Sequence, residues 1–199
     1  MQDRVQHLLI GGWCLLFIIG AGCALSGLAD EPLWYDEAYT AAMAKHSMPD
    51  ILHFCIDDIH PPLYYLLTRM VCRWFGVSAF TLRTVSVLGL LALAALGIGP
   101  VRRLFGLHGS LLFTALVFIM PISYSLGREA RMYPWAWFFV TGSLLYGYLA
   151  ITGGKPQDWL RFGALTILAN YTHLHALLEM LILYTLLFLW ILIHNTANA

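Results

Sequence analysis

Residues 30–62, DEPLWYDEAYTAAMAKHSMPDILHFCIDDIHPP, contain seven of the eleven acidic residues in a chain of 199 residues. The rest of the chain is strongly apolar: hydrophobic residues make up 60% of the sequence and charged residues 11%, against about a quarter charged in a typical soluble domain. We therefore expect an all-α integral membrane protein. In such a protein this acidic stretch is a polar loop, which can hold ionised groups close to a lipid substrate.

Charge and cysteine content narrow the class of protein further. The formal net charge is zero, so the sequence offers no basic surface for nucleic acid. The cysteines have no spacing typical of metal ligands, and we interpret them as small buried apolar residues. A disulfide between Cys55 and Cys72 is the alternative if both face an oxidising compartment.

Apolar runs predict a polytopic bundle of about six transmembrane helices. Residues 8–28 form a run of 21 residues without a charge, which is long enough to cross a hydrocarbon core of roughly 30 Å. A signal peptide is the alternative, but the run is long for one. Further crossings are expected at residues 80–101, 107–126, 133–151, 159–171 and 174–193.

Residues 30–79 are expected to form a long first outer loop with helices that lie in the membrane interface. Residues 34–46 resemble a short helix that ends before Pro49. The 13 residues 63–75 are too few to cross and contain two arginines, each of which would cost about 3 kcal/mol at the centre of a bilayer. We predict that both helices lie near the headgroups rather than inside the hydrocarbon.

Six crossings would bring three polar clusters to one membrane face: the acidic loop, GREARMYPW at residues 127–135 and NYTHLH at residues 170–175. The positive residues do not fix the orientation, because five would lie inside and six outside. The larger number of positive residues outside is explained if several of the outer arginines belong to a functional site. The sequence thus predicts a functional site on the outer face.

Asp36 and Glu37 place two carboxylates side by side after the first crossing. On a helix, neighbouring side chains point about 100° apart, so we expect different tasks for them: one faces a reacting hydroxyl and the other holds an arginine. The alternative is an acidic helix start that only complements the helix dipole.

The end of the acidic loop and the other two clusters carry groups suited to phosphate. His60 precedes a proline pair that begins a helix, and the free amides of that helix could bind a phosphate with it; alternatively His60 is merely solvated. Arg128 and Arg131 are three apart and can share a helix face as a fork of donors, or can bind lipid headgroups. Tyr133 belongs to the same turn as these arginines. His173 lies in a cluster on the same membrane face that is expected to line a cavity; alternatively it is only a buried hydrogen-bonding group.

A metal site is an alternative interpretation of some of these residues, and the sequence supports it less well than a phosphate site. His173, His175 and Asp58 could together offer ligands to a divalent metal, but an H-x-H pair alone is too weak a signal to predict one. We therefore predict no metal ligands, and a divalent metal is the one cofactor left open.

Five motifs occur in an order that resembles a known family. They are WYDEAYTAAMA (34–44), DIHPPLYYLLTRMVCRWFGVSAFTLRTVSVLG (58–89), RRLFG (102–106), LGREARMYPWAW (126–137) and NYTHLHALL (170–178). Together they resemble the amino-terminal half of polyprenyl-phosphate-dependent glycosyltransferases of the C-type fold. The nearest similarity is to bacterial relatives of the protein O-mannosyltransferases and the aminoarabinose transferase of lipid A, which are of the glycosyltransferase family 39 type.

The resemblance implies that residues 1–199 are the amino-terminal part of one transmembrane glycosyltransferase domain whose carboxy-terminal half is missing here. It implies a catalytic outer loop at residues 30–79, with Asp36 as general base beside Glu37. The phosphate of a polyprenyl-linked sugar would meet His60, Arg83, Arg128 and Arg131.

The same resemblance implies a multi-pass protein of a bacterial inner membrane with its active site on the outer face. The partners would be a polyprenyl-phosphate-linked sugar, membrane lipid, and an acceptor that is a glycan, a lipid or a protein, with no nucleic acid. Two alternatives stay open: a transporter or binding module for phospholipid or lipid-linked sugar, and a non-enzymatic truncated membrane subunit.

Overall fold

The computed structural model describes residues 2–58 and 60–197, and within these ranges the chain is helical with no strand. This confirms the all-α class. In chain order the elements are α1 (Gln2–Leu25), α2 (Tyr35–Met43), α3 (Met48–Asp57), α4 (Leu63–Phe75), α5 (Ala79–Ala95), the π-helix η1 (Gly97–Val101), α6 (Arg102–Ile119), α7 (Pro121–Ser125), the 3₁₀-helix η2 (Leu126–Arg128), α8 (Tyr133–Gly153), α9 (Pro156–Asn170) and α10 (Leu174–Ala197).

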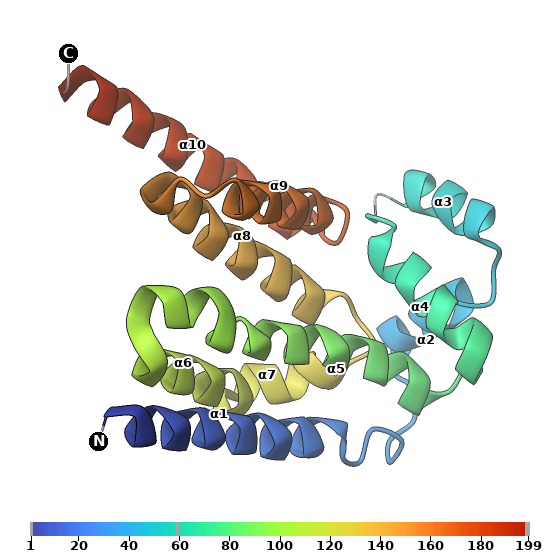
Figure 1. The fold of residues 1–199 in the computed structure, drawn as a ribbon. Helices are drawn as coiled ribbons and strands as arrows, with labels where there is room; N and C mark the ends of the chain where they lie inside the picture. The colour runs from blue at the N-terminus through green and yellow to red at the C-terminus, as the bar shows by residue number, and fades with distance from the viewer. Residues whose placement is uncertain (1, 59, 198–199) are drawn as a thin grey trace.

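Three of the described helical stretches are long and apolar enough to cross a membrane: Arg4–Leu25, Ala79–Ile119 and Tyr133–Gly153. Leu174–Trp190 is apolar but shorter. As one straight helix, the 41 residues of Ala79–Ile119 would extend about 60 Å, roughly twice the hydrocarbon core. The chain folds back within this stretch instead, so it supplies the two antiparallel helices α5 and α6 (Figure 1). The described helices are therefore compatible with a membrane protein.

The turn between α5 and α6 depends on glycine and on buried hydrogen bonds. The turn extends to a kink at Gly106, near the start of α6, which has φ +71°, a left-handed conformation that glycine adopts without a steric cost. Beyond the turn, the Thr114 hydroxyl donates to the Ala94 carbonyl at 3.1 Å and accepts from the Trp13 indole at 2.8 Å. These bonds join α6 to both α5 and α1, so the three helices pack as one layer.

The apolar core lies between the long helices and continues beneath the acidic loop. Leu28, Val87 and Leu90 belong to a buried cluster that joins α1, α5 and α6. A second cluster packs α2, α3 and α4 against α5 around Tyr64 and Tyr65, which are both fully buried. The polar loop is thus a packed part of the bundle, held on the apolar ends of the long helices.

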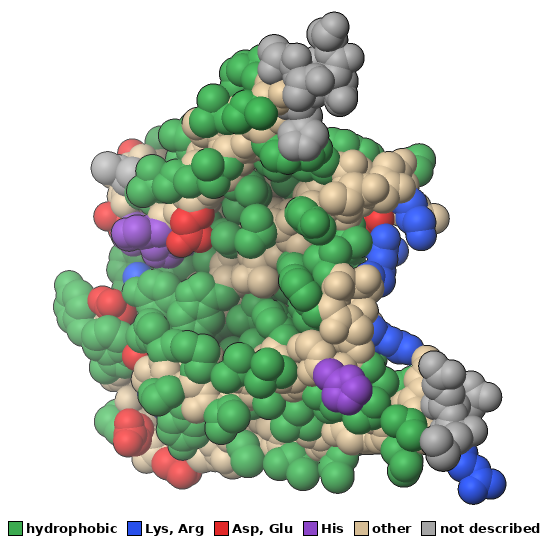
Figure 2. Space-filling view, turned by 90° about the vertical axis from the view of Figure 1, so that its left-hand side faces the viewer, with side chains coloured by type: hydrophobic (Ala, Val, Ile, Leu, Met, Phe, Trp, Pro, Cys, Tyr) green, Lys and Arg blue, Asp and Glu red, His purple; other side chains and the backbone are tan. Residues whose placement is uncertain are grey.

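The two ends of the bundle differ in what they carry. Figure 1 shows the start of α1 and the α5–α6 and α8–α9 connections at one end, and α2, α3 and α4 at the other. At the first end Arg103 donates two hydrogen bonds to the buried Asp158 carboxylate, at 2.7 and 2.6 Å. Figure 2 shows a face that is mostly apolar, with charged side chains gathered at its edges.

The helices of the acidic loop agree only in part with those expected. Helix α4 has the predicted bounds, Leu63–Phe75, and α2 lies within the predicted 34–46. Helix α3 was not predicted, although Ser47 caps it by accepting from the Asp50 amide at 3.4 Å and Pro49 stands in its first turn. Of the cysteines, Cys14 and Cys23 are exposed, Cys55 and Cys72 are buried, and all four are free thiols, so the burial expected for the first pair is wrong.

Candidate functional site

The structure brings the three polar clusters together at the α2–α4 end of the bundle. The Leu63 amide donates to the Tyr171 carbonyl at 2.9 Å, which joins the start of α4 to the turn after α9. The Ala130 amide donates to Glu37 at 2.8 Å, which joins the turn before α8 to α2. Residues separated by about a hundred positions therefore share one small polar region.

The most buried part of this region is an ion pair between Glu37 and Arg83. The Arg83 Nε donates to one carboxylate oxygen at 2.8 Å and Nη2 to the other at 2.6 Å. The two side chains are 1% and 10% exposed, respectively. Burial alone would raise the pKa of Glu37, but the hydrogen bonds from Arg83 and Ala130 outweigh it and hold this pKa below its ordinary value.

Arg83 has no donor left over. Its remaining three N–H groups point at the carbonyls of Leu28 at 2.7 Å, Glu31 at 2.9 Å and Pro32 at 3.1 Å. A guanidinium has five N–H groups, and all five are thus used within the protein. In this arrangement Arg83 cannot contact a phosphate, and Glu37 cannot approach a reacting hydroxyl. The pair instead ties the start of the acidic loop to α5.

Asp36 differs from its neighbour. It lies in the first turn of α2, where it is half-buried, and its backbone carbonyl accepts from Thr40 at 3.4 Å and from Arg131 at 3.5 Å. Among the described residues, no side chain hydrogen-bonds its carboxylate. The carboxylate therefore remains available to an incoming group.

Next to Asp36 lie two buried polar groups without partners. Arg131 is 8% exposed and Tyr65 is fully buried, yet the Arg131 Nε and the Tyr65 hydroxyl have no hydrogen-bond partner among the described residues. Burial raises the pKa of Tyr65 to about 12, an effect that the nearby Arg131 opposes. Burial alone would lower the pKa of Arg131, but Tyr65, Tyr133 and Asp36 raise it overall, so its charge is kept. Unpaired buried donors are costly, and a bound anion would satisfy both.

His60 lies on the other side of Tyr65. Its Nδ1 is 3.1 Å from the Asp58 carboxylate, and the Tyr39 hydroxyl donates to the same carboxylate at 2.7 Å. The hydrogen bond from Tyr39, followed by the His60 ring, lowers the pKa of Asp58. The His60 ring centre is 6.3 Å from that of Tyr65 and 6.0 Å from that of Tyr39. His60 is thus oriented by Asp58 toward the same polar region.

Tyr133 and His173 complete the region. Their ring centres are 5.7 Å apart, and His173 is followed by His175 at 4.9 Å. Burial lowers the pKa of His173, and the nearby His175, Arg131 and His60 lower it further, so His173 is neutral near pH 7. No group of three histidine, cysteine or acidic side chains among the described residues is placed to hold a metal.

Arg128 does not join this region, and the predicted fork with Arg131 is wrong. The two would share a face only on a continuous helix, but η2 ends at Arg128 and Glu129 is extended, with φ −76° and ψ 147°. Arg128 instead donates to the Ser26 carbonyl and lies over the Tyr124 ring, 4.4 Å from its centre. The two arginines of this turn therefore lie in different surroundings: Arg128 contacts Ser26 and Tyr124, and Arg131 lies beside Asp36.

The sequence did not predict Tyr65 or Tyr39 as members of the polar region, and it suggested Asp58 only as a metal ligand. Tyr65, Tyr39 and Asp58 contribute a buried hydroxyl, an aromatic wall and an orienting carboxylate. The tyrosine pair that follows Leu63, one residue after the prolines, was a signal for Tyr65, because a tyrosine at a buried position needs a partner for its hydroxyl.

The fold and site define a helical bundle, compatible with a membrane, that carries at one end a polar region with both carboxylates and buried arginines. Comparisons with protein-family models, curated proteins and solved structures find no match for this chain.

Proposed function

We propose that this chain is the substrate-binding and catalytic part of a membrane glycosyltransferase of the C-type fold, which moves a sugar from a polyprenyl-phosphate carrier to an acceptor hydroxyl. One observation carries the proposal: the Asp36 carboxylate lies beside the buried Arg131 Nε and Tyr65 hydroxyl, and none of these three groups has a hydrogen-bond partner among the described residues. A free carboxylate can accept a proton, and the buried donors can hold a phosphate. Sugar transfer from a phosphate carrier needs both functions together.

The proposed reaction inverts the anomeric carbon. Asp36 takes the proton of the acceptor hydroxyl while its oxygen attacks that carbon from the side opposite the phosphate. The bond between the anomeric carbon and the phosphate oxygen breaks, and the phosphate leaves with the electron pair. Arg131, Tyr65 and His60 stabilise this negative charge. A positioned base typically contributes about 10²- to 10⁴-fold to the rate, and preorganised charge stabilisation is commonly the larger share.

In this proposal the predicted site residues have different roles. Tyr133 and His173 form a wall beside Arg131, whereas Glu37 and Arg83 hold the loop in place. The six crossings, the inner membrane of a bacterium and an outward-facing site belong to the same proposal. The crossings and the outward-facing site are supported by the return of α6 along α5 and by the shared position of the polar turns, whereas the bacterial inner membrane rests on the family resemblance alone.

A lipid-phosphate-binding subunit without chemistry is the second candidate. Arg131 and Tyr65 would hold a phosphate whether or not Asp36 reacts. The neighbouring carboxylate, Glu37, is already held in a structural ion pair with Arg83. This candidate includes the transporter and the truncated subunit, and it predicts lipid binding without transfer.

The test compares Asp36→Asn with the wild-type gene product in its native membrane. Mass spectrometry of membrane glycans, with and without the intact gene, identifies the transferred sugar and the acceptor together. Asparagine keeps the shape and removes the base, so we expect transfer to fall by about 10²-fold or more. Asp57→Asn is the matched control, because the Asp57 side chain is 68% exposed and contacts only His53 among the described residues. Transfer at the wild-type rate by Asp36→Asn would exclude the proposed base.

A further inference from the structure

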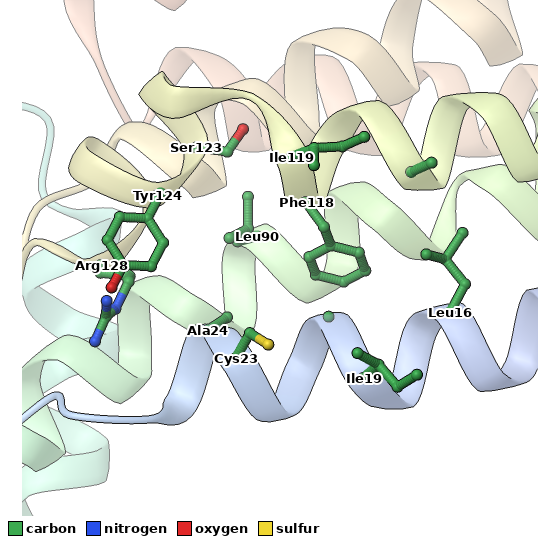
Figure 3. Close-up of a pocket in the computed structure, with 12 residues that line it drawn as sticks. Leu16, Ile19, Cys23, Ala24, Leu90, Phe118, Ile119, Ser123, Tyr124 and Arg128 are labelled. Atoms are coloured by element: carbon green, nitrogen blue, oxygen red, sulfur yellow. The ribbon is translucent and has the colours of Figure 1, made fainter.

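A second feature lies outside the Asp36 region: an apolar groove between α1, α5, α6 and α7 (Figure 3). It has a volume of about 230 Å³. Ile19 and Ile119 are 55% and 72% exposed along it, so the groove opens sideways toward the surrounding membrane rather than into the protein. At its floor the Phe118 ring packs closely on Gly20, where any side chain would overlap the ring. The shape suits a single flexible hydrocarbon chain.

One end of the groove is charged. Figure 3 shows Arg128 and Tyr124 beside one another at this end. The Arg128 guanidinium lies over the Tyr124 ring and donates to the Ser26 carbonyl, while its buried Nε has no partner among the described residues. An arginine at the polar end of a lipid-facing groove is placed to bind the phosphate of a lipid whose chain fills the groove.

The same two residues also line a polar hollow of about 860 Å³, which continues from the end of the groove. Its other charged members are Asp30, Glu31 and Glu129, together with the Glu37–Arg83 pair, which neutralises itself. Beyond Arg128 the hollow is therefore acidic. Burial, together with the nearby Glu37 and Asp36, raises the pKa of Glu129, as expected where carboxylates are crowded.

We propose that the groove and hollow together bind one phospholipid with a primary ammonium headgroup, of the phosphatidylethanolamine class. One of its two acyl chains lies in the groove, the phosphate contacts Arg128, and the ammonium donates hydrogen bonds to the carboxylates of the hollow. A lipid with a net negative headgroup would place uncompensated charge beside Asp30, Glu31 and Glu129. A choline headgroup has no N–H groups for these carboxylates, so the ethanolamine headgroup fits best.

This lipid would be separate from the substrate of the proposed reaction. The groove meets the ends of α1 and α6, and Arg128 contacts neither Tyr65 nor Arg131 in any described interaction. Asp36→Asn, which tests sugar transfer, should therefore leave this lipid bound. The two proposals consequently fail in distinguishable ways.

The experiment uses the full chain in mild detergent, mixed with micelles of phosphatidylethanolamine, phosphatidylglycerol or phosphatidylcholine. Native mass spectrometry counts the lipids that stay bound. We expect one phosphatidylethanolamine, retained at least about tenfold better than either competitor. Arg128→Gln should lower this retention about tenfold, because it removes the charged donor. The matched control is Arg73→Gln, which removes an exposed arginine from α4 and should change nothing.

Two further variants keep the test decisive if Arg128→Gln fails to fold. Ala115→Phe places a ring in the groove and should displace the lipid. The double variant Asp30→Asn, Glu31→Gln should abolish the preference over phosphatidylglycerol. Equal retention of phosphatidylglycerol by the wild type, or unchanged retention in both Arg128→Gln and Ala115→Phe, would overturn the proposal.

Discussion

Asp36 and Glu37 are neighbours in sequence and in the first turn of α2, yet they differ in burial and in the hydrogen bonds of their carboxylates. Glu37 is fully buried, and both its oxygens accept hydrogen bonds, from Arg83, Ala130 and Trp34. Asp36 is half-buried, and only its backbone is engaged in the described hydrogen bonds. The step of about 100° between helix neighbours separates them, because it turns one carboxylate into the bundle and leaves the other at the polar surface.

The same contrast recurs one helix later. Tyr64 and Tyr65 are both fully buried, but the Tyr64 hydroxyl lies 2.7 Å from the Ser86 hydroxyl, while the Tyr65 hydroxyl has no described partner. In each pair one member is satisfied within the protein and one is not. Satisfied groups hold the fold, and the unsatisfied ones, which converge near Arg131, are those that a ligand can use.

The largest effect on stability is expected for Glu37→Gln. This change leaves the Arg83 charge buried beside a neutral amide, and removing one partner of a buried ion pair typically costs about 3–5 kcal/mol. Asp36→Asn is the matched change at the next position and should cost less than about 0.5 kcal/mol, as for surface substitutions. Unfolding in mixed micelles, followed by circular dichroism, measures both. Equal losses in the two variants would show that the assignment of the scaffold to Glu37 is wrong.

A smaller effect should separate the two tyrosines. Tyr64→Phe breaks a buried hydrogen bond and should cost about 1 kcal/mol, while Tyr65→Phe removes an unsatisfied hydroxyl and should leave stability unchanged or slightly higher. Tyr65→Phe should instead weaken binding of a polyprenyl phosphate by about tenfold, since one donor to the phosphate is lost. Thermal unfolding gives the first comparison, and titration with the lipid phosphate gives the second. Unchanged lipid affinity in Tyr65→Phe would remove Tyr65 from the site.

The parts that could be predicted from sequence are those with local causes. The bounds of α4 follow from the proline pair at its start and from Gly76 after it, with φ +77°. The pairing of Glu37 with an arginine was expected in kind from helix geometry, but which arginine it meets was not, because Arg83 is 46 residues away. Contacts of that range depend on how helices pack, and a single sequence does not encode them locally.

The fork of Arg128 and Arg131 failed for a related reason. Their spacing of three has a meaning only on a helix, and the chain leaves the helical conformation at Glu129. No proline or glycine marks that break between the two arginines. The break has a functional consequence, because it separates Arg128, the arginine proposed to bind a lipid, from Arg131, which lies beside Asp36.

The smallest effect is the dependence of stability on pH that the buried Glu37 carboxylate contributes. The pKa of Glu37 in the folded protein lies below the ordinary value of 4.5, so its contribution to stability is complete above pH 4.5 and is lost as the pH falls through the lower, folded value. Several other carboxylates titrate nearby, so the difference between the wild type and Glu37→Gln isolates this contribution. We expect the stability gap between them to narrow as the pH is lowered from 7 to below 4, since protonation removes from the wild type the charge that the variant already lacks. Thermal unfolding of the wild type and of Glu37→Gln at each pH provides the measurement. A gap that stays constant over that range would show that the ion pair of Glu37 does not contribute in this way.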